Sequence, residues 1–183
     1  MRKIYDDKSW SFLIASPAFS GPVFEESVVL LLEDNEDGSF GIIINKSSRK
    51  TLGELNADFL STDLADVEVF EGGPISKDRI SLALCTGEDG AEGSFTFGVS
   101  PEKAREVLDK HPTAKIGAFA GYAGWEAGQL QMEINEGTWI VCNADINLMF
   151  DVPPEEIWEE LLLRECPQFE KLPPPTDEQV DSN

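Results

Sequence analysis

Histidine and basic residues are scarce in this chain of 183 residues, and their scarcity argues against several kinds of chemistry. The single histidine, His111, stands before Pro112 at the expected end of a helix, so a histidine-based zinc or iron site has no support. A catalytic triad would also need partners in space that a lone histidine does not reveal. We therefore expect no metal and no cofactor, and the sequence offers no catalytic residue.

Disulfide, phosphate-loop and membrane signals are missing as well. The three cysteines, Cys85, Cys142 and Cys166, are far apart and odd in number, which indicates neither a disulfide framework nor a zinc site. The glycine-rich pieces lack the lysine and the serine or threonine of a phosphate-binding loop. No apolar run is long enough to cross a membrane, and the N-terminus has no apolar signal-peptide core. These absences together predict a cytoplasmic protein.

Acidic residues are abundant instead: 35 acidic against 14 basic residues give a formal net charge of −21. The acids are spread along the whole chain. Such a field repels phosphate backbones, so no direct contact with nucleic acid is expected. A solvated acidic surface that maintains solubility is the plain explanation, and an acidic patch for a basic partner is the alternative.

The apolar patterning predicts a single α+β domain. The segment SVVLLL at 27–32 is apolar on both sides, which is typical of a central strand covered on both faces, and Asp37-Gly38 predicts a hairpin into the next strand. Helices are predicted after Thr51, from Pro101 to about His111, and after Pro154. A loop is predicted at 145–150. A short apolar run lies at 11–15, and strands are predicted at 27–32, 40–45, 67–70, 80–85, 94–99, 116–125 and 138–142.

The stretch from Lys115 to Val141 organises the chain, because glycines and aromatic residues crowd there between a strand and an amphipathic segment. Ala127, Leu130 and Ile134 recur at helical spacing, with Gly137 as a C-terminal cap. The alternation of 129–134 also fits a strand. The helix is the preferred interpretation, since a short polar link then leads directly into a better strand.

Candidate binding residues cluster in the same stretch. On a helix, Glu126, Gln129 and Glu133 would form a polar stripe beside Tyr122 and Trp125, and an aromatic wall with these groups could hold a small polar or cationic ligand. The competing interpretation is structural: Gln129 or Glu133 would satisfy backbone groups of the glycine turn. Asn45, at the end of a core strand, is likewise interpreted as a turn-forming cap.

The order and spacing of several motifs resemble one family. LIASPAFSGPVFEESVVLLLEDNEDGSFGIIINKS, VFEGGPIS, AGYAGWEAGQLQMEINEGTWIV, LMFD and IWEELL are together similar to the AlgH/YqgE family of bacterial proteins, over Phe12 to about Leu163. The resemblance implies a strongly bent, mixed and mainly antiparallel sheet, a pseudo-barrel, flanked by a few helices. Members are often labelled transcriptional regulators, although their function is unestablished. The family's motif positions in this chain are Gly41, Asn45, Gly72, Gly73, Pro74, Gly121, Tyr122, Gly124, Trp125, Gly128, Gln129, Leu130 and Glu133.

The chain departs from the family pattern twice. Leu84-Cys85 replaces a frequent Leu-His, so a role for that histidine does not apply here. Glu126-Ala127 replaces a frequent Gly-Pro, which would lengthen the helix by a turn. The expected organisation is an N-terminal arm at 1–10, one AlgH-like domain at 11–166, and a disordered, acidic, proline-rich tail at 167–183.

Three functional hypotheses follow. The first is a non-enzymatic binding or regulatory protein that contacts a protein or a small polar ligand. Its candidate binding residues are Asn45, Gly73, Tyr122, Trp125, Gln129 and Glu133. The second is an enzyme of unknown reaction with Glu133 as acid or base. The third, direct action as a transcription factor, conflicts with the charge of −21 and with the lack of a helix-turn-helix pattern.

Overall fold

The strands form one bent, open sheet in the computed structural model, which describes residues 10–18, 21–86 and 94–171. Within those residues nine strands form the sheet: seven follow the path β4-β5-β8-β3-β2-β1-β9, β6 pairs with β8, and β7 pairs with β6. Among the described strands, only β5 and β8 pair in parallel. The strands are β1 (Ser11–Ala15), β2 (Val28–Asn35), β3 (Gly38–Ile43), β4 (Ser47–Thr51), β5 (Glu68–Glu71), β6 (Ile75–Thr86), β7 (Ser94–Val99), β8 (Lys115–Glu126) and β9 (Trp139–Asn143).

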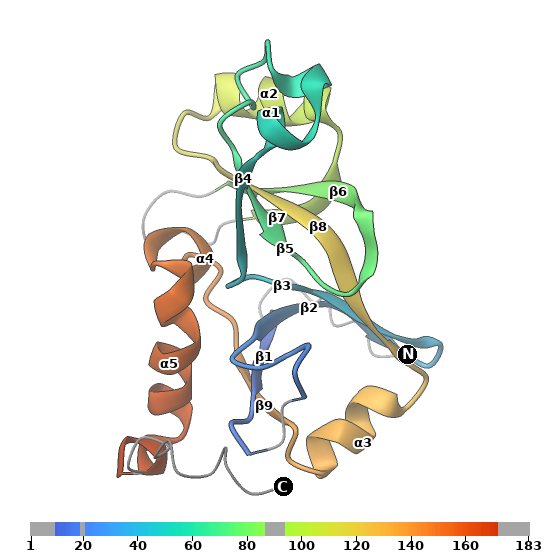
Figure 1. Ribbon diagram of the computed structural model, residues 1–183, viewed down its shortest axis with the longest axis vertical. Helices are drawn as coiled ribbons and strands as arrows, with labels where there is room; N and C mark the ends of the chain where they lie inside the picture. Colours follow the sequence, from blue (N-terminus) through green and yellow to red (C-terminus); the bar gives the residue numbers. More distant parts are fainter. Residues whose placement is uncertain (1–9, 19–20, 87–93, 172–183) are drawn as a thin grey trace, which may run out of the picture.

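Strand β8 belongs to both halves of the sheet (Figure 1). Its first half pairs with β5 and β6, and its second half pairs with β3. Between the halves lies Gly121, whose φ of +73° turns the strand and is accessible mainly to glycine. The bent, mainly antiparallel sheet expected from the resemblance is confirmed. It does not close into a barrel, because among the described residues β4 pairs only with β5 and β9 only with β1.

Both faces of β1 and β2 are buried, as the apolar run at 27–32 predicts. Phe12, Val28 and Leu30 face one core, which Ile157 and Leu161 of helix α5 (Pro154–Glu165) complete. Their neighbours along the strands face a second core with Leu130 of helix α3 and two tryptophans. The predicted hairpin is confirmed, with Asn35 opposite Gly38.

The helices lie around this sheet (Figure 1): α1 and α2 at one end, α5 along one side and α3 on another. The predicted capping box of α1 is present, since Thr51 and Glu54 satisfy each other's backbone N–H groups. Ser100 caps α2, as predicted. The helices are α1 (Leu52–Leu55), α2 (Pro101–Lys110), α3 (Gln129–Asn135), α4 (Leu148–Asp151) and α5 (Pro154–Glu165), with 3-10 turns at Ala57–Phe59 and Pro167–Lys171.

Several local predictions need correction. Residues 145–150 were expected to be a loop, but Leu148–Asp151 forms the single helical turn α4. Strand β4 was missed, and β6 begins five residues before the predicted 80–85. Glu126-Ala127 does not lengthen α3, because β8 continues to Glu126 and the helix begins at Gln129 after Gly128 in the left-handed region.

The ends of the chain and one loop lie largely outside the described residues. The predicted arm at 1–10 is described only at Trp10, and the glycine-rich acidic loop lies at 87–93. Of the predicted tail at 167–183, residues 167–171 form a 3-10 turn that follows α5, and 172–183 lie outside the description.

Candidate functional site

The Gly72-Gly73-Pro74 turn crosses directly over strand β8. The backbone N–H of Gly72 donates to the carbonyl of Ala120 at 2.8 Å, and its own carbonyl accepts from Ile43 at 2.8 Å. A Cβ on Gly73 would lie 2.1 Å from the carbonyl carbon of Tyr122, so only glycine fits this crossing. The crossing therefore fixes the backbone of β8 at Tyr122.

Tyr122 presents a half-buried ring and an uncommitted hydroxyl. Its ring meets Phe40 of β3 edge to face, with centroids 6.2 Å apart and an interplanar angle of 80°. Its hydroxyl makes no hydrogen bond to any described residue and is not buried. The group is thus available to a bound molecule.

A broad, open hollow lies beside Tyr122, between the β2–β3 hairpin and the end of β8. Its volume is about 670 Å³, and it is referred to below as the acidic hollow. Three carboxylates and three aromatic rings line it, and no lysine or arginine does. The lining residues are Glu33, Asn35, Asp37, Gly38, Ser39, Phe40, Ile75, Tyr122, Gly124, Trp125, Glu126 and Gln129.

Glu133 lies behind the Trp125 indole, which forms one wall of this hollow, and fixes its position. Its Oε2 accepts hydrogen bonds from the indole Nε1 groups of Trp125 and Trp139, both at 2.8 Å. Its Oε1 accepts from Nε2 of Gln129 at 2.9 Å. Gln129 in turn accepts from the backbone N–H of Glu126 at 3.0 Å. Because three side-chain N–H donors already occupy the Glu133 carboxylate, its present role is to position the two tryptophans.

Aromatic packing reinforces that arrangement. Trp125 and Trp139 meet edge to face at 5.9 Å, and Phe24 contacts both rings. Trp125 is buried, so only part of its ring reaches the hollow. The wall is therefore rigid, since the three rings and the carboxylate restrict one another.

Sequence comparison places the chain among known proteins. The sequence profile of the AlgH-like family matches residues 12–169. The chain belongs to the AlgH-like family. UPF0301 protein AlgH of Pseudomonas aeruginosa is 34% identical over 167 residues, which cover 79% of this chain and 82% of that protein. A UPF0301 protein of Streptomyces coelicolor is 33% identical over 163 residues, 84% of each chain.

Solved structures agree with this assignment. The solution structure of the Pseudomonas aeruginosa AlgH protein superposes with a TM-score of 0.67 and 28% identity, over 96% of this chain and 99% of that one. A crystal structure of a protein from Corynebacterium diphtheriae superposes with a TM-score of 0.68, over 90% of each chain. At 21% identity, the second likeness concerns the fold alone.

In this AlgH-like fold the six candidate residues predicted from the sequence do not form one site. Tyr122, Trp125 and Gln129 line the acidic hollow, and Glu133 lies behind it. Asn45 is buried with 6% of its surface exposed and is fully engaged by backbone groups: its Oδ1 accepts from Val28 N–H and its Nδ2 donates to Glu26 O, both at 2.8 Å. That geometry agrees with its interpretation as a cap.

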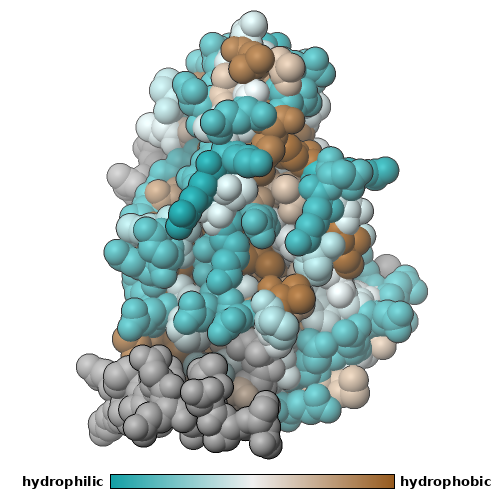
Figure 2. Space-filling view, in the orientation of Figure 1, coloured by the Kyte–Doolittle hydropathy of each residue, from teal (hydrophilic) through white to brown (hydrophobic). Residues whose placement is uncertain are grey.

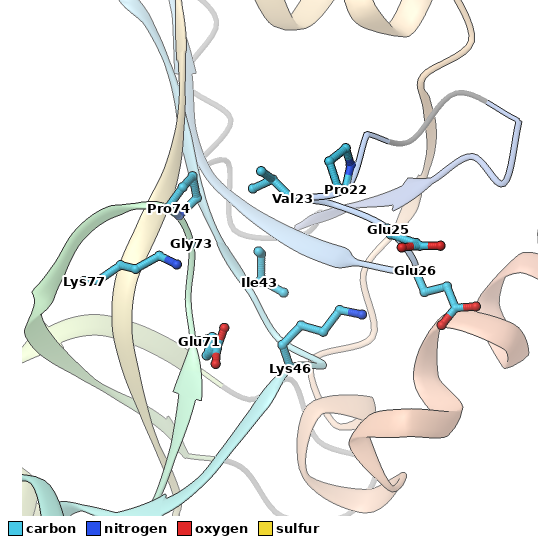
Figure 3. Close-up of a pocket in the computed structure, with 10 residues that line it drawn as sticks. All are labelled: Pro22, Val23, Glu25, Glu26, Ile43, Lys46, Glu71, Gly73, Pro74 and Lys77. Atoms are coloured by element: carbon cyan, nitrogen blue, oxygen red, sulfur yellow. The ribbon is translucent and has the colours of Figure 1, made fainter. Parts of the chain in front are cut away.

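Gly73 lines a separate, smaller hollow of about 280 Å³. Figure 3 shows Lys77 extending toward Gly73 and Lys46 extending toward the side of Glu25 and Glu26, with Ile43 and Glu71 between the two lysines in the view. Neither ammonium group is within 4.0 Å of a carboxylate among the described residues. Glu25 and Glu26 also line this hollow, so it carries charges of both signs.

The sequence did not predict the contribution of Glu33, Asp37 and Phe40 to the acidic hollow. They come from the β2–β3 hairpin, which the pairing of Ser39 with Trp125 brings alongside β8. The Asp37-Gly38 turn predicted the hairpin itself, but nothing local indicated which strand would lie beside it.

The remaining candidate features of the chain give no further indication of a functional site. In the described part of the chain no group of three histidine, cysteine or acidic side chains could hold a metal ion. His111 is exposed at the C-terminal cap of α2, as predicted. No helix among residues 10–18, 21–86 and 94–171 is long and apolar enough to cross a membrane. The surface in Figure 2 is mainly hydrophilic, with small groups of hydrophobic residues.

Proposed function

We propose that this AlgH-like protein acts by binding, and that the acidic hollow receives a cationic group of a partner protein or of a small ligand. The observation that supports this proposal is the composition of the lining: three carboxylates, three aromatic rings and no basic side chain. A cytoplasmic location is part of the proposal, because Cys85, Cys142 and Cys166 are all free thiols.

Charge favours a cation in this hollow at two ranges. Near the hollow, Glu33, Asp37 and Glu126 have no lysine or arginine within 4.0 Å among the described residues. An incoming cation would therefore gain attraction without breaking an existing ion pair. At low ionic strength, where screening is weak, the net charge of −21 also raises the concentration of cations around the whole molecule.

The aromatic residues add specificity for organic cations. Ring faces attract ammonium and guanidinium groups, and this attraction is stronger when the rings are partly desolvated, as Tyr122 and Trp125 are. The Tyr122 hydroxyl supplies an acceptor for an N–H donor, and Oδ1 of Asn35, which already accepts from the backbone N–H of Asp37 at 2.8 Å, has a second lone pair. Because the hollow is broad and open, a lysine or arginine side chain presented by a partner protein fits it as well as a free amine does.

The decisive experiment is a titration of the labelled protein with N-acetyl-arginine amide and with a short arginine-containing peptide, followed by backbone amide NMR. We expect shifts at Asp37, Tyr122 and Glu126. The double variant D37N/E126Q should weaken binding by about tenfold. The matched control E155Q/E156Q removes the same charge from exposed residues at the start of α5.

The two double variants separate local recognition from general attraction. If D37N/E126Q and E155Q/E156Q weaken binding equally, the cation responds only to net charge and the proposal is wrong. Shifts of the peptide complex that extend beyond those of the amide probe would identify a protein partner. Equal shifts would identify a small cationic ligand.

The geometry gives less support to the enzyme hypothesis and to direct DNA binding. Glu133 does not line the acidic hollow, and three donors already hold its carboxylate, so we do not assign it an acid or base role. Direct DNA binding is not proposed, since the lining of the hollow is acidic and the net charge is −21.

A further inference from the structure

A further hollow also borders the Tyr122 ring. Its volume is about 500 Å³, and it is referred to below as the Arg79 hollow. It shares only Phe40 and Tyr122 with the acidic hollow, and no carboxylate lines it. Its lining residues are Phe40, Ser76, Arg79, Ser81, Phe97, Gly121 and Tyr122.

A bulge in β6 builds this hollow. Ile75 pairs with Tyr122 and Ile80 with Ala120, so the four β6 residues between them stand opposite Gly121 alone. The bulge fits closely over Gly121, where a Cβ would lie 2.7 Å from the carbonyl oxygen of Ile75. Ser76 adopts a left-handed φ of +53°, which is unfavourable for a residue other than glycine. This strained conformation of the bulge places Ser76 and Arg79 around the hollow.

The polar groups of the hollow are uncommitted. The Arg79 guanidinium has no carboxylate within 4.0 Å among the described residues, although the chain carries 35 acidic residues. The hydroxyls of Ser76 and Ser81 make no hydrogen bond within the same part of the chain. An arginine, two hydroxyl donors and three aromatic rings therefore surround one space.

We propose that the Arg79 hollow binds an anionic group carried on an aromatic or similarly apolar body, namely a small organic carboxylate or phosphate monoester. The planar guanidinium can donate two parallel hydrogen bonds to either oxyanion. The serine hydroxyls can donate to its remaining oxygens, and the rings can cover the apolar body.

The acidic surface does not prevent this binding. At physiological ionic strength the screening length is about 8 Å, so distant carboxylates contribute little to the potential at Arg79. The volume of about 500 Å³ is within the range of small-molecule sites.

The test is an amide NMR titration with benzoate, phenyl phosphate and benzyl alcohol, which share a ring and differ in charge. Benzoate or phenyl phosphate should shift the amides of Ser76, Arg79 and Gly121 and should bind at least about tenfold more tightly than benzyl alcohol. The stronger of the two anions identifies the carboxylate or the phosphate as the preferred group.

Variants of arginine give the decisive comparison. R79M should lower affinity for the anion by about tenfold or more while leaving the weak binding of benzyl alcohol unchanged, which also shows that the hollow is intact. R79K should recover part of the loss. R105M, at an exposed arginine of α2, is the matched control and should bind as the parent does.

Two results would overturn the inference: equal binding of benzoate, phenyl phosphate and benzyl alcohol, or equal loss in R79M and R105M. This inference does not depend on the acidic hollow. Asp37 and Glu126 do not line the Arg79 hollow and Arg79 does not line the acidic one, so the two sets of variants fail or succeed separately.

Discussion

Trp125 and Glu133, eight residues apart in the chain, are joined by a hydrogen bond of 2.8 Å from the indole Nε1 to the carboxylate Oε2. The same oxygen accepts the indole of Trp139, so one carboxylate ties the end of β8 to the start of β9 across helix α3. The polar stripe recognised in the sequence therefore stabilises the fold, and its stabilising contribution can be measured.

Glu133→Gln should lower the free energy of unfolding by about 2 kcal/mol at an unchanged m-value. The new amide keeps one acceptor oxygen but turns an N–H donor toward an existing donor of Gln129 or an indole. Urea unfolding measured by far-UV circular dichroism checks this. Glu136→Gln, an exposed residue just after α3, should change stability by less than about 0.5 kcal/mol. Equal effects of the two variants would contradict the structural role.

Gly73→Ala should prevent folding or cost more than about 3 kcal/mol, because its methyl group would lie 2.2 Å from the carbonyl oxygen of Tyr122. The yield of folded protein and its urea midpoint measure this effect. Gly128 supplies the control, since it has a left-handed φ of +76° but open space around the added methyl group. Gly128→Ala should cost only about 1 kcal/mol. A similar loss at both positions would mean that conformation, not the crossing, requires glycine at Gly73.

Asn45→Ala should lower the free energy of unfolding by about 2 kcal/mol. The substitution leaves the N–H of Val28 without its acceptor and removes the donor to the carbonyl of Glu26, a residue with a left-handed φ of +51°. Thermal or urea unfolding measures the change. Asn147→Ala, at an exposed asparagine without a side-chain capping bond, is the control and should be nearly neutral.

The three thiols should differ in their reactivity with an aromatic disulfide reagent at about pH 8. Burial raises the pKa of the Cys85 and Cys142 thiols, whereas Cys166 is partly exposed. One thiol should therefore react quickly in the folded protein and all three in urea. Cys166→Ser should remove the fast reaction, and a fast reaction that persists in this variant would contradict the burial of the other two.

The same pKa shifts give a sign for stability at alkaline pH. A thiol whose pKa is raised on folding holds its proton more tightly in the folded state, so the stability it contributes is complete below the unfolded pKa. That contribution is lost as the pH rises through the folded pKa. The unfolding free energy should thus fall above about pH 9, and Cys85→Ala with Cys142→Ala should reduce this fall.

Local signals in the sequence predicted much of the fold. The Thr51–Glu54 capping box, the Ser100-Pro101 start of α2 and the Asp37-Gly38 hairpin are confirmed because each depends on residues that are neighbours in the chain. Strand β4 was missed because Ser47–Thr51 is polar and is a strand only by pairing with β5. The first part of β6 was missed because its bulge interrupts any alternation.

The candidate sites likewise contain some contacts that the sequence predicted and others that it did not. The spacing of Gln129 and Glu133 predicted a contact on one helix face, and the hydrogen bond at 2.9 Å confirms that contact. The wall that Phe40 and Asp37 contribute, and the approach of Arg79 to Tyr122, depend on which strands lie on either side of β8. Such neighbours are set by the packing of the whole chain, so a single sequence does not show them.

Strand β8 belongs to both halves of the sheet, and this has a consequence for the cooperativity of unfolding. If β8 detaches, β5, β6 and β3 each lose one of their two hydrogen-bonded neighbours. Each half of the sheet would then lose the strand that it shares with the other half. The protein should therefore melt in one transition seen alike by tryptophan fluorescence and by far-UV circular dichroism, and no single cut between β3 and β8 would yield two fragments that fold alone.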